Sequence, residues 1–246
     1  MRVAVVTGAS SGIGAELCRQ LRGRGYRVVG LSRRPAPDAD EHEPCDVAER
    51  ETVETTARRV LARHPRIDLL VCNAGIAARD TYLASEPELV EAVTRTNYLG
   101  SVWSLLAFLP GLGEGSKLLV VASVAGTVAA GPYSASKHAQ LAFARSVAIE
   151  LAPRGVHVLA ALPGYVETPG FPQRDRMGFP WRLVVVDPPF VATRMLAALD
   201  RGKREIVVPR WYRPAMWLQA LVPGLLMRRR DVHAPVPTRS GSRART

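Results

Sequence analysis

Short apolar runs rich in Val, Leu and Ile alternate along the chain with longer segments whose apolar residues recur at helical spacing. This alternation predicts βαβ units, in which parallel strands form one sheet with helices on both faces. The predicted strands are Arg2–Thr7, Arg27–Leu31, Leu69–Cys72, Lys117–Ala122, Val156–Leu162 and Glu205–Val208. The predicted helices are Gly14–Arg22, Glu49–Ala62, Pro87–Leu109 and Ser134–Leu151. The pattern therefore predicts an α/β fold, a doubly wound parallel sheet in a single domain.

The periodicity fails between Pro163 and Pro189, a stretch that holds six prolines. A loop of this length inside a compact domain usually carries function. We therefore expect a flap over residues 168–189, within a main domain that covers residues 1–208.

The C-terminal part differs in character from the main domain. Residues 209–230 combine Trp, Leu and Met with Arg, and prolines and a glycine interrupt the apolar run before it reaches the length of a membrane span. Two interpretations stay open: a helix packed on its own domain or on a second subunit, or a segment that makes peripheral contact with a membrane. Residues 231–246, rich in Pro, Ser, Gly and Arg, predict a disordered tail.

Composition excludes a largely disordered chain, because 246 residues that are 47% hydrophobic and 22% charged can bury a sizeable core. The net charge of +11 is concentrated near the end, where 11 Lys and Arg face 3 Asp and Glu from Asp200 onward. Such a segment suits phosphates or an anionic membrane surface. No nucleic-acid-binding motif accompanies it, and we expect no nucleic-acid partner.

The cysteines and histidines point to no covalent framework and no metal. Three scattered cysteines lack a Cys-x-x-Cys pair, which favours a reducing compartment. The apolar N-terminal run is too short for a secretory signal, so we expect a cytoplasmic protein, with peripheral membrane association as the alternative. Five histidines show no ligand spacing, and no metal site is expected.

A glycine-rich segment, Thr7-Gly8-Ala9-Ser10-Ser11-Gly12-Ile13-Gly14, follows the first predicted strand and opens the first helix. Glycines there let the backbone turn sharply and approach a pyrophosphate at the helix N-terminus. This context favours a Rossmann-like dinucleotide-binding sheet. The candidate cofactor-binding residues here are Gly8, Ser10, Ser11, Gly12, Ile13 and Gly14.

Tyr133 and Lys137 lie four residues apart and so share one face of a predicted helix. A free tyrosine has a pKa near 10, and bringing it to about 7 takes roughly 4 kcal/mol of preferential stabilisation of the phenolate. A nearby ammonium can supply much of that stabilisation. The pair is therefore a candidate general acid/base, although the spacing alone also fits an ordinary surface pair.

Further segments occur in a fixed order: Cys72-Asn73-Ala74-Gly75, Asn97, Ser123, Tyr133-Ser134-Ala135-Ser136-Lys137 and Pro163-Gly164-Tyr165-Val166-Glu167-Thr168. Together with the glycine-rich turn, they make the chain resemble the short-chain dehydrogenase/reductase family, and in particular members that act on lipophilic alcohols and ketones. The resemblance implies that Tyr133 exchanges a proton with the substrate oxygen, beside Lys137. It also implies that Ser123 binds this oxygen and that Asn97 holds a water. The interval of ten residues from Ser123 to Tyr133 is about three shorter than the family's.

Cofactor choice depends on Ser32-Arg33-Arg34, which follow the second predicted strand. No acid is present for the ribose hydroxyls of NAD, while Arg33 and Arg34 suit a 2′-phosphate, so NADP(H) is favoured over NAD(H). The resemblance adds further cofactor-binding positions, namely Asp46, Val47, Asn73, Ala74, Gly75, Tyr133, Lys137, Pro163, Gly164, Val166 and Thr168.

The leading hypothesis is an NADP-dependent oxidoreductase that interconverts a small lipophilic alcohol with a ketone or aldehyde. The catalytic residues would be Asn97, Ser123, Tyr133 and Lys137, in a dinucleotide-binding catalytic domain over residues 1–208, and the resemblance favours a homo-oligomer. One alternative is a non-catalytic dinucleotide-binding regulator or scaffold. Another is a nucleic-acid or membrane-surface binder that relies on the basic C-terminal segment.

Overall fold

The computed structural model describes residues 1–222 apart from 79–80, 129, 170–173, 175–178 and 180. Within these ranges one sheet of seven parallel strands has the order β3-β2-β1-β4-β5-β6-β7. The strands are β1 Arg2–Thr7, β2 Tyr26–Ser32, β3 Glu41–Pro44, β4 Leu69–Cys72, β5 Lys117–Val121, β6 His157–Pro163 and β7 Glu205–Val208. The chain order reverses between β1 and β4, which is where doubly wound sheets bind their ligands.

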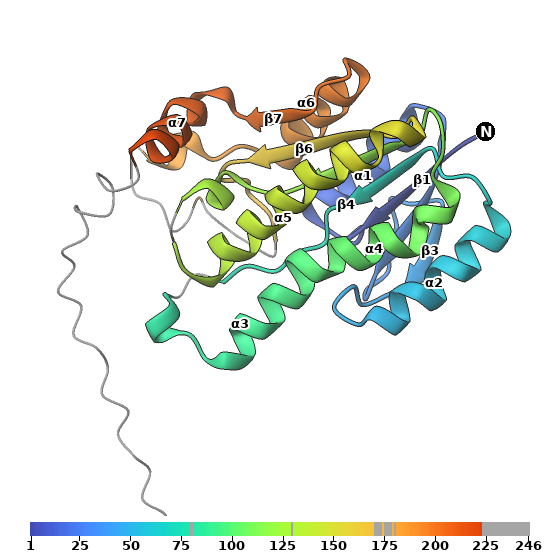
Figure 1. Cartoon of the computed structure of the whole chain (residues 1–246), viewed down its shortest axis with the longest axis horizontal. Coiled ribbons are helices and arrows are strands. Elements are labelled where there is room, and N and C mark those ends of the chain that lie inside the picture. The colour runs from blue at the N-terminus through green and yellow to red at the C-terminus, as the bar shows by residue number, and fades with distance from the viewer. Residues whose placement is uncertain (79–80, 129, 170–173, 175–178, 180, 223–246) are drawn as a thin grey trace, which may run out of the picture.

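Helices cover both faces of this sheet (Figure 1). On one face α1 (Gly12–Gly23) packs beside α6 (Pro188–Asp200). The opposite face carries α2 (Arg50–Arg63), α4 (Gly100–Phe108) and α5 (Gly131–Glu150). The predicted doubly wound α/β fold is thus confirmed.

Two apolar layers form the core because successive strand residues face opposite sides. In β1, Val3 and Val5 belong to the layer under α2, α4 and α5, whereas Ala4 and Val6 belong to the layer under α1 and α6. Both faces of the strand are therefore buried. This explains why the strands read as continuous apolar runs rather than as an alternation.

Two elements were absent from the sequence prediction. The edge strand β3 has the sequence Glu-His-Glu-Pro, and its Glu43 pairs with Arg59 and Arg63 of α2 at 2.9 and 2.6 Å, so no apolar run marks it. Helix α6 begins at Pro188, inside the stretch predicted as a flap up to Pro189. The predicted C-terminal end of the flap was therefore wrong. Proline is tolerated in the first turn of a helix, so these prolines do not mark a loop. Much of the rest of the predicted flap lies outside the described residues.

The long helix predicted over Pro87–Leu109 consists of three consecutive elements. They are α3 (Pro87–Val93), a π-helical stretch (Thr94–Leu99) and α4. Gly100 does not interrupt the path. A Cβ there would lie 2.8 Å from Val47 Cγ2, so the glycine lets α4 pack closely on the segment that precedes α2.

After β7 the chain folds back onto the domain. A short 3-10 turn (Arg210–Tyr212) leads into α7 (Arg213–Leu221), and the side chains of Tyr212 and Met216 pack against the core. A Cβ at Gly164 would lie 2.2 Å from the Tyr212 ring. Of the two interpretations of residues 209–230, the described part therefore fits a segment that packs on its own domain. Residues 223–230 of that segment and the predicted tail 231–246 lie outside the described residues.

None of the helices in the described ranges combines the length and apolar character needed to cross a bilayer. The outward side of α7 is nevertheless apolar, because Trp217, Leu218 and Leu221 are exposed. Arg213 lies over the Trp217 ring, with 5.5 Å between the guanidinium carbon and the ring centroid.

Candidate active site

The ends of β1 and β4 are tied together by Thr7, a residue that the sequence analysis did not single out. Its buried hydroxyl accepts hydrogen bonds from the backbone N–H groups of Asn73 (2.9 Å) and Ala74 (3.0 Å) and donates to the Val71 carbonyl (3.2 Å). The Asn73 side-chain amide donates to the Thr7 carbonyl at 3.0 Å. These bonds fix the carboxyl edge of the sheet where the chain order reverses.

The glycine-rich turn leaves no room for side chains. Gly8 and Gly12 adopt φ values of 67° and 58°, a region that disfavours other residues. A Cβ at Gly14 would lie 2.1 Å from the Gly8 carbonyl oxygen, and one at Gly12 would lie 3.0 Å from Thr168 Cγ2. Ser11 begins α1 without capping it through its hydroxyl. The bare backbone at this helix N-terminus fits a diphosphate. Thr168 lies next to this turn, and its role in cofactor binding stays a prediction.

At the end of β2 the predicted ribose-binding residues come together. The Ser32 hydroxyl is buried and donates to the Arg34 carbonyl at 2.7 Å. Arg33 is exposed and lies 3.6 Å from a carboxylate oxygen of Asp46, whose other oxygen accepts from the Ala48 N–H at 3.0 Å. No acid follows Ser32 directly, and Asp46 offsets part of the positive charge that Arg33 and Arg34 bring to this strand end.

Three predicted cofactor-binding positions take part in packing within the domain. Val47 is buried in the core against Gly100. Gly164 lies under the ring of Tyr212, so its missing side chain makes room for the C-terminal segment. Val166 is also buried, and it forms an isolated parallel bridge with Val186. The structure therefore gives these three positions a packing role that the motif did not reveal.

Tyr133 and Lys137 lie one turn apart on α5, and Ser123 lies two residues after the end of β5. The Lys137 side chain is buried, and its Nζ donates to the Val121 carbonyl (3.0 Å) and to Gln140 Oε1 (2.8 Å). Nζ lies 5.9 Å from the centroid of the Tyr133 ring. Tyr133 shares a hydrogen bond with the Ser123 hydroxyl, which also donates to the Pro163 carbonyl at 3.4 Å.

The short interval between Ser123 and Tyr133 is accommodated by close packing. A 3-10 turn, Val124–Thr127, follows Ser123 at once, and a Cβ at Gly126 would lie 2.6 Å from the Lys137 carbonyl oxygen. Because glycine lets this turn touch α5, the connection needs few residues. Ser123 and Tyr133 therefore meet in spite of the shortened loop.

Burial changes the pKa of both residues of the pair. Burial raises the pKa of Tyr133, and the hydrogen bond with Ser123 opposes that rise only in part. Burial also lowers the pKa of Lys137 to about 7. Loss of water disfavours the charged form of both groups, so the lowering of the tyrosine pKa by a neighbouring ammonium stays a prediction.

Asn97 lies in the π-helical stretch and is fully buried. Its amide exchanges two hydrogen bonds with the backbone of Ile76, at 2.8 and 3.0 Å, and donates to Ser136 Oγ of α5 at 3.0 Å. A Cβ at Gly75 would lie 3.1 Å from Asn97 Oδ1 and 3.6 Å from Lys137 Nζ. Asn97 thus joins the loop after β4 to α5, while the water that the resemblance implies stays a prediction.

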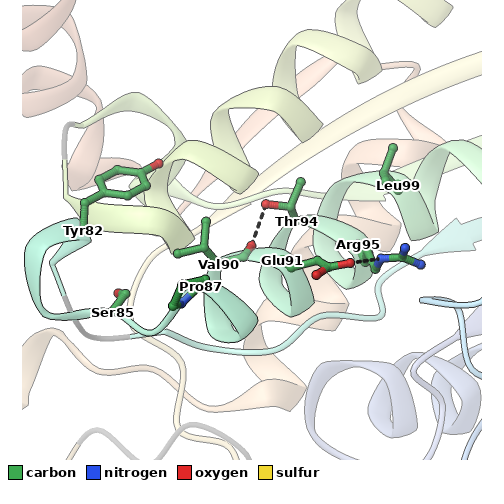
Figure 2. Close-up of a pocket in the computed structure, with 8 residues that line it drawn as sticks. All are labelled: Tyr82, Ser85, Pro87, Val90, Glu91, Thr94, Arg95 and Leu99. Carbon is green, nitrogen blue, oxygen red and sulfur yellow. Dashed lines mark hydrogen bonds and ion pairs between the residues drawn. The ribbon is translucent and has the colours of Figure 1, made fainter. Parts of the chain in front are cut away.

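A groove of about 530 Å³ lies elsewhere, on the outer side of α3 and the π-helical stretch (Figure 2). Within it Thr94 donates to the Val90 carbonyl at 2.7 Å and Arg95 pairs with Glu91 at 2.8 Å. Its lining residues are Tyr82, Ser85, Pro87, Val90, Glu91, Thr94, Arg95 and Leu99. None of the predicted site residues lines it, so the groove does not locate the chemistry.

The sheet order, the glycine cradle at the switch in chain order, and the Ser–Tyr–Lys cluster beside it define a Rossmann-like protein that binds a dinucleotide. The family model described as short chain dehydrogenase matches residues 2–177. The chain belongs to this family of oxidoreductases, whose fold binds nicotinamide dinucleotides and whose members act on small molecules.

Named relatives agree with this assignment. A protein of Streptomyces virginiae named "Monensin polyketide synthase putative ketoacyl reductase" is 37% identical over 199 residues, which cover 72% of this chain and 75% of that protein. Dehydrogenase/reductase SDR family member 7B of Bos taurus is 29% identical, covering 92% of this chain and 79% of that protein.

Solved structures show the same fold. A short-chain dehydrogenase from Streptomyces avermitilis has a TM-score of 0.79 and 26% identity, covering 92% of this chain and 97% of its own. An alcohol dehydrogenase from Thermococcus sibiricus, complexed with 5-hydroxy-NADP, has a TM-score of 0.74 and 26% identity, with coverage of 84% and 95%.

Proposed function

We propose that the chain is an NADP-dependent oxidoreductase that interconverts a lipophilic alcohol with a ketone or aldehyde. The observation that carries this proposal is the hydrogen-bonded pair of Ser123 and Tyr133, with Lys137 one turn along the same helix. The pair lies at the sheet edge that also holds the glycine cradle. A proton donor beside a dinucleotide cradle is what carbonyl reduction requires.

The residues of the site divide the proton chemistry among them. NADP(H), when bound, supplies or accepts the hydride. Ser123 and Tyr133 donate hydrogen bonds to the carbonyl oxygen of the substrate, and Tyr133 transfers its proton to that oxygen as negative charge develops there. Lys137 stabilises the phenolate that remains. In alcohol oxidation the same groups act in reverse, with Tyr133 as the base.

The preference for NADP rests on the end of β2. Ser32 presents no carboxylate to a ribose, and the exposed side chains of Arg33 and Arg34 carry the charge that a 2′-phosphate needs. The solved relatives from Thermococcus sibiricus and Burkholderia cenocepacia, with 5-hydroxy-NADP and NADP bound, support this choice.

The substrate proposal rests on relatives and on surface character. The relatives named a ketoacyl reductase and an alcohol dehydrogenase favour a carbonyl or alcohol substrate. Phe179 and Leu183, in the described part of the predicted flap, are 80% and 69% exposed. Apolar side chains at these positions suit a lipophilic substrate.

The test combines NADPH fluorescence with turnover on ketones and aldehydes of increasing chain length. We expect NADPH binding and a kcat/KM that rises with chain length. Binding of NADPH without turnover across the panel would contradict the enzyme assignment and favour the regulator or scaffold. Absence of NADPH binding would remove both.

We also propose that the chain forms a homo-oligomer through α4 and α5. Leu106 of α4 and Ile149 of α5 lie on helices that cover the same face of the sheet and are 59% and 75% exposed, and a second copy of the chain would cover them. Light scattering after size exclusion should give a multiple of the 26.7 kDa chain mass. A Leu106→Ser, Ile149→Ser variant should shift towards the monomer, and a monomeric wild type would contradict the proposal.

A third proposal, peripheral contact with an anionic membrane, rests on the outward apolar side of α7. Trp217 and Leu221 are 62% and 81% exposed beside Arg213, and aromatic, aliphatic and cationic groups together favour the membrane interface. Sedimentation with phosphatidylserine vesicles should retain the wild type more than a Trp217→Ser, Leu221→Ser variant. Leu83→Ser, at an 80% exposed site elsewhere, is the matched control. Equal sedimentation of all three proteins would refute membrane contact.

A further inference from the structure

A chain of buried polar side chains lies behind Lys137, between α5 and the π-helical stretch with α4. Gln140 and Asn97 have no exposed surface, and Ser101 and Lys137 are 3% and 4% exposed. Polar groups buried to this degree are costly unless their hydrogen bonds are satisfied. Their hydrogen bonds are therefore expected to have a defined arrangement.

The direction of each hydrogen bond follows from its neighbour. The Ser101 hydroxyl donates to the Asn97 carbonyl at 3.2 Å, so its oxygen accepts from Gln140 Nε2 at 2.7 Å. With its NH₂ group turned to Ser101, Gln140 presents Oε1 to Lys137 Nζ at 2.8 Å. Ser101 thus fixes which end of the Gln140 amide faces the lysine.

An ammonium group has three N–H directions. Two of those of Lys137 are taken by the Val121 carbonyl at 3.0 Å and by Gln140 Oε1. On the remaining side Nζ lies close to Gly75, whose added Cβ would be 3.6 Å away, and 5.9 Å from the centroid of the Tyr133 ring. Within the part of the chain that the structure describes, one direction of the nitrogen is left for a group bound between Gly75 and Tyr133.

We propose that Gln140, held by Ser101, is a positioning residue that keeps an acceptor on Lys137 Nζ and directs the remaining N–H towards Tyr133 and the cofactor. This role rests on the proposed oxidoreductase function for its catalytic meaning. Gln140 touches neither substrate nor cofactor in this account. It acts only through the lysine, by stabilising the protonated amine and fixing its orientation.

The surroundings of Nζ make this acceptor important. Tyr133 is the titratable group that faces it from α5, and Cys72 of β4 contacts the Ser101 carbonyl, with a pKa that burial raises to about 12. The other groups around Lys137 are neutral, namely Val121 of β5, Gly75 of the loop after β4 and Ser101 of α4. Burial without a neighbouring carboxylate lowers the pKa of Lys137 to about 7. The Gln140 oxygen offsets part of this loss.

The test follows the titration of Lys137 directly, using lysine labelled with carbon-13 at Cε. The sequence has three lysines, so Lys117 and Lys203 serve as internal references and Lys137→Arg assigns the third signal. Replacing Gln140 by Met keeps the length of the side chain and removes the acceptor. We expect the Lys137 midpoint to fall by roughly one pH unit, because hydrogen bonds to charged groups are stronger than those to neutral ones.

Gln140→Glu should move the same midpoint in the opposite direction, by roughly one unit or more, because it keeps an acceptor and adds charge. A merely structural role predicts no such change of sign. Gln20→Met is the matched control, because this half-buried glutamine of α1 bonds Glu16 and Thr193 on the opposite face of the sheet, and it should leave the midpoint unchanged. A Gln140→Met, Ser101→Ala variant removes both partners of the Gln140–Ser101 bond, which keeps the measurement available if Gln140→Met alone folds poorly.

The titration needs neither substrate nor cofactor, so its outcome is separate from the proposed function. In active enzyme the acidic limb of the kcat profile should move with the Lys137 midpoint in each variant. Unchanged midpoints in Gln140→Met and Gln140→Glu would overturn the role of Gln140, even in an active enzyme. Opposite shifts in a wild type without turnover would support the role of Gln140 and contradict the oxidoreductase.

Discussion

Gly14 offers a direct test of the glycine cradle, because an alanine there would meet backbone rather than a mobile side chain. Its Cβ would lie 2.1 Å from the Gly8 carbonyl oxygen and 2.5 Å from Asn73 Nδ2. Both distances are about 1 Å or more inside an ordinary contact of about 3.5 Å. Relieving such overlap costs about 1–3 kcal/mol, and loss of an Asn73 hydrogen bond adds about 1 kcal/mol.

We therefore expect Gly14→Ala to lower the free energy of unfolding by about 2–4 kcal/mol and Tm by roughly 5–15 °C. NADPH should bind at least about tenfold more weakly, since a distorted turn no longer presents its backbone to the diphosphate. Urea unfolding and NADPH fluorescence titration measure the two effects.

Gly23→Ala is the matched control, in the same helix, because a Cβ there has no neighbour within 4 Å among the described residues. It should change stability by less than about 1 kcal/mol and leave NADPH affinity unaltered. If Gly14→Ala behaved like Gly23→Ala in both assays, the closed turn and its assignment to the cofactor would be refuted.

Three further predictions concern charge and packing. Replacing Arg33 and Arg34 by Ala should weaken NADPH about tenfold or more and NADH by less than about twofold in fluorescence titrations, and equal losses would contradict a 2′-phosphate site. Burial lowers the pKa of Lys137 to about 7, so the unfolded chain binds more protons from pH 7 to about 10. The wild type should therefore gain up to about 1.4 kcal/mol per pH unit relative to Lys137→Met in urea unfolding, whereas a constant difference would count against this burial. A Cβ at Gly164 would lie 2.2 Å from the Tyr212 ring, so Gly164→Ala should displace that ring and change tryptophan fluorescence. In the double variant Gly164→Ala, Tyr212→Ala, the loss in free energy of unfolding should be smaller than the sum of the losses in the two single variants. Strict additivity would argue against the contact.

The buried strands could be predicted from the sequence because both faces of the sheet are covered. The apolar runs at β1, β4, β5 and β6 are long enough to exclude a solvent-facing strand. The edge strand β3 could not be predicted, since its Glu side chains pair with arginines of α2 and its His42 ring contacts the Ser32 carbonyl of β2, instead of entering the core. Helix α6 was missed because Pro188 and Pro189, read as loop residues, occupy its first turn.

The site was predictable where chemistry depends on spacing along the chain. Gly8 and Gly14, or Tyr133 and Lys137, are close in sequence, and their relation follows from turn and helix geometry. The contact of Gln140 with Ser101 joins residues 39 positions apart, so no local pattern predicts it. The pKa direction of Tyr133 was also out of reach, because it depends on how completely the fold removes water.

The central claim, proton transfer by Tyr133 beside a bound nicotinamide, is tested most directly by Tyr133→Phe measured for both turnover and NADPH affinity. The variant removes the phenolic proton and keeps the ring, so turnover should fall by about 10² to 10⁴-fold while the NADPH Kd stays within about twofold of the wild type. Tyr26→Phe, away from the site, should match the wild type in both. A Tyr133→Phe enzyme that reduces its carbonyl substrate at the wild-type rate would contradict the account.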